Sequence, residues 1–112
     1  MLNPWFLLQL TLIKLFSSVF LCGLLVSQVQ AAPDLANGKN IDQQKCYACH
    51  AKKTGFGNGD MIYTRSDSKV KSIANLKRMV SLCNTELRLN LFPEDEADVV
   101  AYLNQQFYKL KP

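Results

Sequence analysis

The chain has 112 residues, and its 13 lysines and arginines against 9 aspartates and glutamates give a formal net charge of +4. Hydrophobic residues make up 48% of it and are concentrated in the first 31 positions, which leaves length for one small domain at most. Multi-domain enzymes are therefore excluded, and the lack of a fixed-period repeat excludes repeat arrays. The positive surplus is small and scattered, so a nucleic-acid-binding module is not expected.

The first 31 residues have the pattern of a secretory signal peptide. Lys14 is the last positive charge before an apolar stretch over Leu15–Val26, and Val29 and Ala31 place small side chains where a signal peptidase reads. This stretch is shorter than the roughly 20 residues that span a membrane. We expect residues 1–31 to be cleaved and residues 32–112 to function in the periplasm of a bacterium. If Lys14 is tolerated in a bilayer, Phe6–Val29 is instead an uncleaved anchor.

Removal of the first 31 residues leaves three cysteines, Cys46, Cys49 and Cys83. An odd number argues against a disulfide framework in an exported protein and indicates another use for at least two thiols. The remaining chain, with 12 Lys and Arg against 9 Asp and Glu, has a net charge of +3. A domain this short rarely buries enough apolar surface to be stable without a disulfide, metal or cofactor.

The first predicted helix after the signal covers Leu35–Gln44, with Pro33 and Asp34 at its start. A glycine-rich turn region follows over residues 54–60. Residues 61–71 show no helical period, so Ile62–Thr64 is expected to be extended or loop.

Helical periodicity returns at Ser72, and either Ser72 or Asn75 is a candidate cap. Apolar side chains then recur at spacings of three and four residues, at Ile73, Leu76, Met79, Val80, Cys83 and Leu87. An apolar loop over Leu89–Phe92 precedes a last helix that begins at Pro93 with three acidic residues and ends at Tyr108-Lys109. Its predicted buried stripe consists of Val99, Val100, Leu103 and Phe107. The elements predict an all-α fold of three to four helices.

Residues 46–50 read Cys-Tyr-Ala-Cys-His, the C-x-x-C-H signature of c-type haem attachment. The thiols of Cys46 and Cys49 would add to the two vinyl groups of one porphyrin, and a helix beginning here brings His50 under the iron as its proximal ligand. A redox dithiol would need a βαβ setting, which is absent from the predicted elements. A zinc site would need a second ligand pair, and His50 is the only histidine. We expect one covalently bound haem c that fills the core.

Two segments resemble the short class I c-type cytochromes. Gly38-Lys39-Asn40-Ile41 stands eight residues before Cys46, and residues 99–103 read Val-Val-Ala-Tyr-Leu. In that family G-K-x-L-F precedes C-x-x-C-H, and V-x-A-Y-L lies on the last helix. The resemblance covers residues 35–50 and 94–107. It implies a small cytochrome c-like fold around one haem, in which the first and last helices cross and Gly38 meets Tyr102.

The sequence departs from that family at three places. Asp42 stands where the family usually has an aromatic residue. No proline follows His50 until Pro93, so the loop proline whose carbonyl orients the proximal histidine is missing. No methionine precedes the last helix, where the sixth iron ligand is expected in the family.

Four side chains are candidates for the sixth iron ligand, namely Met61, Met79, Cys83 and Asn84. Met79 has a thioether that would raise the potential, and its place on the apolar stripe also fits a core methionine. Met61 follows a turn that could fold it over the haem, or it is a loop residue at the haem edge. Cys83 would lower the potential as a thiolate, or it is an inert thiol or forms an intermolecular disulfide. Asn84 is the weakest candidate.

A second resemblance covers the C-terminal half. Cys83-Asn84, Pro93 and Ala97-Asp98 resemble the high-spin, oxygen-binding monohaem cytochromes. In that family an asparagine directly before the cysteine is the distal ligand, and a second cysteine closes a disulfide. Leu82 and Leu91 occupy those positions here, so neither feature carries over. Residues 63–108 also resemble a group of small bacterial monohaem cytochromes, which implies no particular activity.

The sequence predicts a carrier of single electrons between redox partner proteins, not an enzyme. Lys45, Lys52 and Lys53 flank the motif and could steer an acidic partner, although scattered lysines are commonly just solvated. We expect a monomer without a nucleic-acid partner, in contact with a membrane only if residues 1–31 stay attached. One alternative is a haem protein whose open distal position binds or reacts with oxygen, nitric oxide or a sulfur species. The other is a non-autonomous subunit of a larger oxidoreductase.

Overall fold

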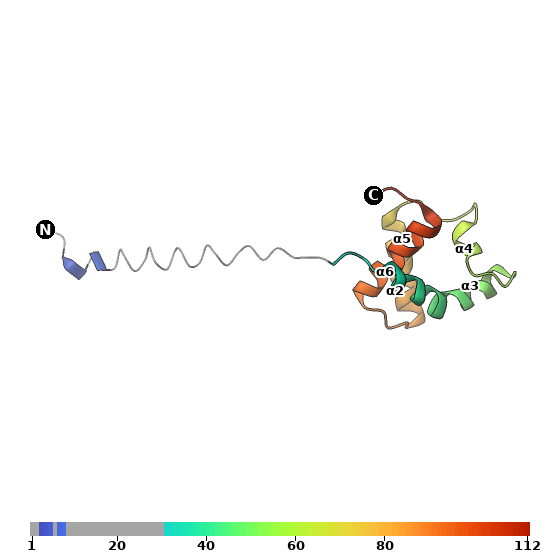
Figure 1. Ribbon diagram of the computed structural model, residues 1–112, viewed down its shortest axis with the longest axis horizontal. Helices are drawn as coiled ribbons and strands as arrows, with labels where there is room; N and C mark the ends of the chain where they lie inside the picture. The colour runs from blue at the N-terminus through green and yellow to red at the C-terminus, as the bar shows by residue number, and fades with distance from the viewer. Residues whose placement is uncertain (1–2, 6, 9–30) are drawn as a thin grey trace. The chain divides into compact units, whose positions relative to one another are not determined.

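The computed structural model describes residues 3–5, 7–8 and 31–112. The chain divides into two units, residues 1–31 and residues 32–112. The predicted signal peptide, and its alternative as an anchor, lie almost wholly outside the described residues and stay predictions. In the part of the chain that is described, no helix is long and apolar enough to cross a membrane. Residues 32–112 contain helices and no strand, which confirms the predicted all-α class (Figure 1).

The first helical stretch of residues 32–112 is longer than predicted. It consists of α2 (Leu35–Ile41), the π-helix η1 (Asp42–Cys46) and α3 (Tyr47–Thr54), which follow one another without a break. The predicted end at Gln44 is wrong. No glycine or proline lies between Gln44 and Gly55, and Gly55 ends the stretch in the left-handed conformation with φ of 75°.

Side-chain hydrogen bonds fix the start of α2 and attach it to the last helix. Asp34 caps α2, because its Oδ1 accepts hydrogen bonds from the backbone N of Ala36 and Asn37 at 2.8 and 3.1 Å. The backbone N of Asp34 donates to Oδ1 of Asp98 at 2.7 Å. Asn37 Nδ2 donates to Asp98 Oδ2 at 2.8 Å and to Asp95 Oδ1 at 3.1 Å. The start of α2 is therefore held to the first half of α6.

The segment that was expected to be extended or loop contains a short helix, α4 (Met61–Thr64). A single turn is too short to show a helical period in the sequence, which explains the wrong prediction. The turn before it is closed by a hydrogen bond from the backbone N of Asp60 to Asn58 Oδ1 at 3.0 Å. Tyr63 is the buried residue of α4, so tertiary packing holds this helix in place.

The last two helical stretches agree with the prediction. α5 (Ile73–Leu87) is capped by Ser72, whose hydroxyl accepts a hydrogen bond from a backbone N–H three residues on at 3.1 Å. The following stretch consists of α6 (Pro93–Leu103), which has proline in its first position, and the π-helix η2 (Asn104–Tyr108). The apolar segment between α5 and α6 is a loop, as predicted.

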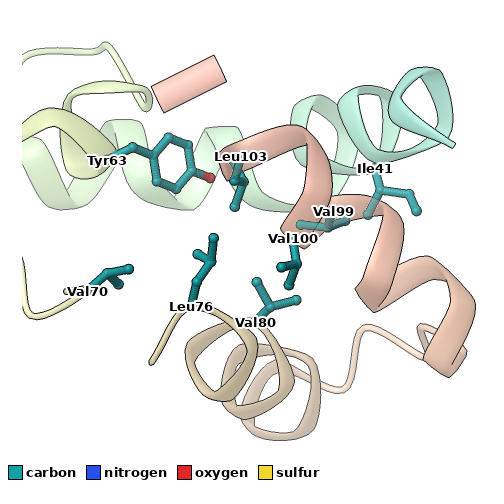
Figure 2. Packing of buried hydrophobic residues seen from close by; sticks show 8 residues of the cluster. All are labelled: Ile41, Tyr63, Val70, Leu76, Val80, Val99, Val100 and Leu103. Carbon is teal, nitrogen blue, oxygen red and sulfur yellow. The ribbon is translucent and has the colours of Figure 1, made fainter. Parts of the chain in front are cut away.

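The hydrophobic core lies where α2 and α5 pack against α6. Its buried members are Ile41, Tyr63, Val70, Leu76, Val80, Val99, Val100 and Leu103. Figure 2 shows Leu76 of α5 directed toward Leu103 of α6, and Val80 of α5 beside Val100 of α6. The predicted stripe of the last helix is confirmed for its first three members, whereas Phe107 is only partly buried.

Candidate functional site

The three residues of the C-x-x-C-H motif that would bind a haem line one cavity. Cys46 is the last residue of η1, and Cys49 and His50 follow in α3. Residues three and four apart lie on the same face of a helix, so the local geometry directs the three side chains to one side. The cavity has a volume of about 270 Å³.

Apolar side chains form most of the remaining wall of this cavity. Leu76 and Val80 come from α5, Val99 and Leu103 come from α6, and Val70 comes from the segment before α5. Protein interiors are close-packed, with few voids larger than a water molecule. A cavity walled by apolar side chains and bordered by two thiols and an imidazole is suited to a mainly apolar ligand.

The imidazole of His50 is only partly accessible. Its Nδ1 atom is buried and has no hydrogen-bond partner. Burial lowers the pKa of His50, and the positive charge of Lys53 lowers it further, while Asp60 acts in the opposite direction. The imidazole is therefore neutral at pH 7, which is the form that binds a metal.

The thiol of Cys46 stays protonated in its surroundings. Burial is the main cause that raises the pKa of Cys46 to about 12, and the negative charge of Asp42 adds to it. A redox dithiol needs the reverse, because the thiolate is the attacking species and its pKa is lowered in such motifs. The environment of Cys46 thus weighs against a redox dithiol.

Two candidates for the sixth iron ligand, Met79 and Cys83, lie on α5 and line the cavity. Met79 is 38% exposed and does not belong to the core cluster, so the interpretation as a core methionine is not supported. Cys83 is a free and partly buried thiol. Burial raises its pKa, the charge of Lys53 lowers it, and Cys49 raises it.

The other two candidates are placed elsewhere. Met61 is 40% exposed and does not line the cavity. The amide of Asn84 holds the loop between α5 and α6. Its Nδ2 donates to the Leu91 carbonyl at 3.0 Å and to Glu96 Oε1 at 2.7 Å, and its Oδ1 accepts from the Leu91 backbone N at 3.0 Å. Asn84 therefore has a structural role. Met79 and Cys83 of α5 remain as the candidate ligands that line the cavity.

Sequence reasoning missed a buried polar pair beside the motif. Asp42 is 1% exposed and Tyr63 is 7% exposed, and the Tyr63 hydroxyl donates a hydrogen bond to Asp42 Oδ1. Burial raises the pKa of Asp42, and the hydrogen bond from Tyr63 partly offsets this. The sequence offered one indication of this pair, because Asp42 stands where the short class I c-type cytochromes, which the sequence resembles, usually have an aromatic residue. Its partner lies 21 positions further along the chain, in a segment without periodicity, and was not foreseen.

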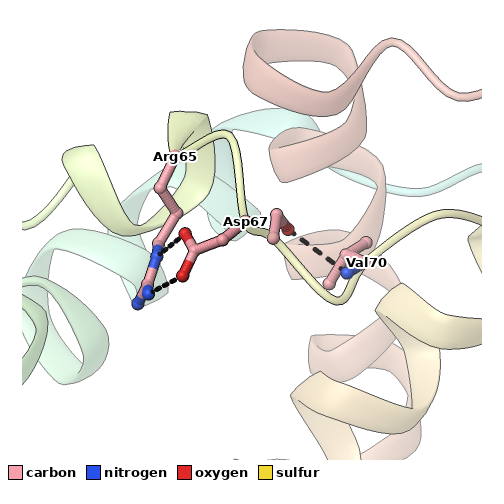
Figure 3. A network of polar contacts seen from close by, with 4 residues as sticks. Arg65, Asp67 and Val70 are labelled. Atoms are coloured by element: carbon pink, nitrogen blue, oxygen red, sulfur yellow. Dashed lines mark hydrogen bonds and ion pairs between the residues drawn. The ribbon is translucent and has the colours of Figure 1, made fainter.

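Four basic side chains also line the cavity, namely Lys45, Lys53, Arg65 and Lys69. Figure 3 shows Arg65 paired with Asp67, with 2.6 Å between Nε and Oδ1 and a second contact between Nη2 and Oδ2. The loop that carries them is closed by a hydrogen bond from the Val70 backbone N to Ser68 Oγ at 3.2 Å. Both ions of the pair are exposed, so it contributes little to stability and leaves the guanidinium near the cavity.

No protein-family model, no curated protein and no solved structure matches the chain. The residues of the cavity are therefore the guide to its chemistry. In the described residues, no group of three or more His, Cys, Asp or Glu side chains is arranged to hold a metal ion. A haem iron takes four ligands from the porphyrin and needs no such group. Two thiols at this spacing, a neutral imidazole and apolar walls fit a covalently bound haem.

Proposed function

We propose that this protein is an exported monohaem c-type cytochrome that transfers single electrons between redox partners in the bacterial periplasm. Residues 1–31 would direct export, and residues 32–112 would form the cytochrome c-like domain. The observation that supports this most strongly is that Cys46, Cys49 and His50 line one cavity with apolar walls.

Each residue of the motif has a defined role in this proposal. The thiols of Cys46 and Cys49 hold the haem through two thioether bonds. His50 binds the iron through its imidazole, which its environment keeps neutral. A bound haem supplies an iron that gains and loses one electron. The apolar wall keeps water away from the group, and this exclusion together with the axial ligands sets the potential.

The sixth ligand comes from α5 in this proposal. The loop of residues 88–92 between α5 and α6 contains no methionine. Of the two sulfur-containing side chains of α5 that line the cavity, Met79 is the better ligand. A thioether binds without losing a proton, whereas burial raises the pKa of the Cys83 thiol and disfavours the thiolate.

A haem protein with an open distal position is the second candidate. Its support is the exposure of Met79, because a side chain outside the core is not held in one place by packing. An iron without a fixed sixth ligand would bind small molecules such as oxygen, nitric oxide or a sulfur species.

The subunit alternative is motivated by the short domain and by the apolar loop before α6, and the support from the loop is weaker than expected. Leu89 lines the cavity, and Leu91 packs against the core. Phe92 is exposed. The apolar character of the loop is therefore explained largely by contacts within the chain.

A basic rim would guide the redox partner. Of the three lysines that flank the motif, Lys45 and Lys53 line the cavity and Lys52 does not. Lys69 extends the rim from the segment before α5. Positive charge around the exposed part of a redox site favours encounter with an acidic protein, and this attraction weakens with salt.

The deciding experiment is an absorption spectrum of the purified exported protein, oxidised, reduced and reduced under carbon monoxide, with a pyridine haemochrome assay for covalent haem. We expect covalent haem c and a low-spin reduced spectrum that carbon monoxide leaves unchanged. Uptake of carbon monoxide would favour the second candidate. A folded, soluble protein without covalent haem would refute the proposed function.

A further inference from the structure

Tyr63 lies between the imidazole of His50 and a buried carboxylate. Its ring is perpendicular to that of His50, with an interplanar angle of 86° and 5.2 Å between the ring centroids. Its hydroxyl donates a hydrogen bond to Asp42 Oδ1. These three side chains therefore form a continuous series of contacts from η1 through α4 to α3.

The surroundings of Tyr63 fix its position. The rings of Phe107 and Tyr108, both in η2, have centroids 5.0 and 6.1 Å from that of Tyr63. A buried carboxyl group is costly unless it is hydrogen-bonded, and the hydrogen bond from the Tyr63 hydroxyl meets this need of Asp42. Packing on the ring and a hydrogen bond at its tip leave Tyr63 little freedom to move.

The imidazole of His50 has this fixed ring as a neighbour. A histidine that binds a metal usually donates its second ring N–H to a carbonyl or carboxylate, and this bond fixes the ring plane. In His50, Nδ1 is buried without a hydrogen-bond partner. The ring contact with Tyr63 is present instead, and perpendicular aromatic pairs have a preferred geometry. A rigid perpendicular ring restricts rotation of the imidazole about its Cβ–Cγ bond.

We propose that Tyr63 is a positioning residue which, anchored by the buried side chain of Asp42, sets the plane of the His50 imidazole. This inference rests on the proposed function, because the plane of the ring matters when His50 binds an iron. Tyr63 takes the place of a hydrogen bond from His50 Nδ1, and it acts on the iron only through His50.

The test measures the orientation of the axial imidazole directly. The g values in the electron paramagnetic resonance spectrum of the ferric protein, and the spread of the haem methyl proton resonances, both respond to the plane of an axial histidine. We would compare the haem-loaded wild type with Tyr63→Leu, which removes the ring, and Tyr63→Phe, which keeps the ring and removes the anchor. Asp42→Leu removes the acceptor, and Asp42→Asn keeps a carbonyl oxygen for it. Tyr102→Phe is the matched control, since it also removes a tyrosine hydroxyl but leaves the contacts of Tyr63 with His50 and Asp42 in place.

We expect Tyr63→Leu, Tyr63→Phe and Asp42→Leu to shift the g values and the methyl resonances. Asp42→Asn should restore most of the wild-type spectrum, and Tyr102→Phe should leave it unchanged. A merely structural role would lower the unfolding temperature without moving these signals. If Tyr63→Leu does not fold, Tyr63→Phe and the Asp42 pair still decide the question.

Three contrary results are distinguishable. Wild-type protein that carries no covalent haem would overturn the proposed function and this inference together. Haem-loaded Tyr63→Phe and Asp42→Leu with wild-type signals would overturn this inference and leave the proposed function intact. A shift as large in Tyr102→Phe as in Tyr63→Phe would also overturn it, because the effect would then not be specific to the contact with His50.

Discussion

Gly38 and Tyr102 lie at the crossing of α2 and α6, where the two helices touch through their backbones. A Cβ atom on Gly38 would be 2.2 Å from the Asp98 carbonyl oxygen and 2.9 Å from the Tyr102 Cβ. The expectation that Gly38 meets Tyr102 is therefore confirmed. This crossing also brings the start of α2 to the carboxylates of α6, and it places η1 and the motif beside the core.

Gly38→Ala should destabilise the protein, because the methyl group overlaps with backbone atoms that cannot move aside without separating α2 from α6. Inserting one carbon into a tightly packed contact costs about 1–3 kcal/mol, and backbone overlap places this variant at the upper end. Denaturant unfolding of the haem-loaded protein measures the change. Lys39→Ala, on the exposed face of the same helix, should change the free energy of unfolding by less than about 0.5 kcal/mol. Equal stability of Gly38→Ala and wild type would contradict the close approach.

Cys46→Ser should yield a chain that does not fold and is degraded after export. The domain is short, and its core surrounds a cavity that haem is expected to fill, so the loss of attachment removes part of the core. The measurement is the yield of folded protein together with haem staining of a denaturing gel. Cys83→Ala is the matched control and should retain haem and the wild-type spectrum. A folded, haem-free Cys46→Ser protein in normal yield would show that haem does not complete the core.

Met79→Leu should convert the reduced protein to a form that takes up carbon monoxide. Leucine has a similar volume but no sulfur, so the variant removes the proposed sixth ligand with little change in packing. The reduced spectrum with and without carbon monoxide measures this. Met61→Leu serves as control, because Met61 does not line the cavity, and its spectrum should equal that of the wild type. If Met79→Leu keeps a low-spin spectrum and Cys83→Ala loses it, the thiol is the ligand instead.

Asp42→Asn should reduce the dependence of stability on pH. Burial raises the pKa of Asp42 above its ordinary value of 3.8, so between that value and the folded pKa the folded state binds more protons than the unfolded state. The stabilisation from Asp42 is therefore fully present below pH 3.8 and is lost as pH rises through the folded pKa. The measurement is the free energy of unfolding of the haem-loaded wild type and of Asp42→Asn, from pH 4 upward. If the variant became more stable relative to the wild type as the pH was lowered, the prediction would be contradicted.

Much of the architecture could be predicted because its signals are local. The capping side chains of Asp34 and Ser72 satisfy backbone groups within three residues, and the apolar spacing of α5 reflects the helical repeat. The motif residues Cys46, Cys49 and His50 lie within about one helical turn of one another, so any helix at this place puts them on one face. These features depend on neighbours in sequence, so composition and spacing were sufficient to predict them.

Other features depend on residues far apart in the chain. Periodicity placed Met79 on the same apolar stripe as Leu76. Both side chains line the cavity, but Leu76 is buried and Met79 is exposed, and this difference arises only when α5 packs against α6. Similarly, Asp42 is acceptable in the interior because the Tyr63 hydroxyl reaches it from α4. Local spacing establishes which residues are helical and which share a face, because those follow from backbone geometry. Which of those faces is filled by the chain, and which is left for a ligand, follows from contacts that form when distant helices pack.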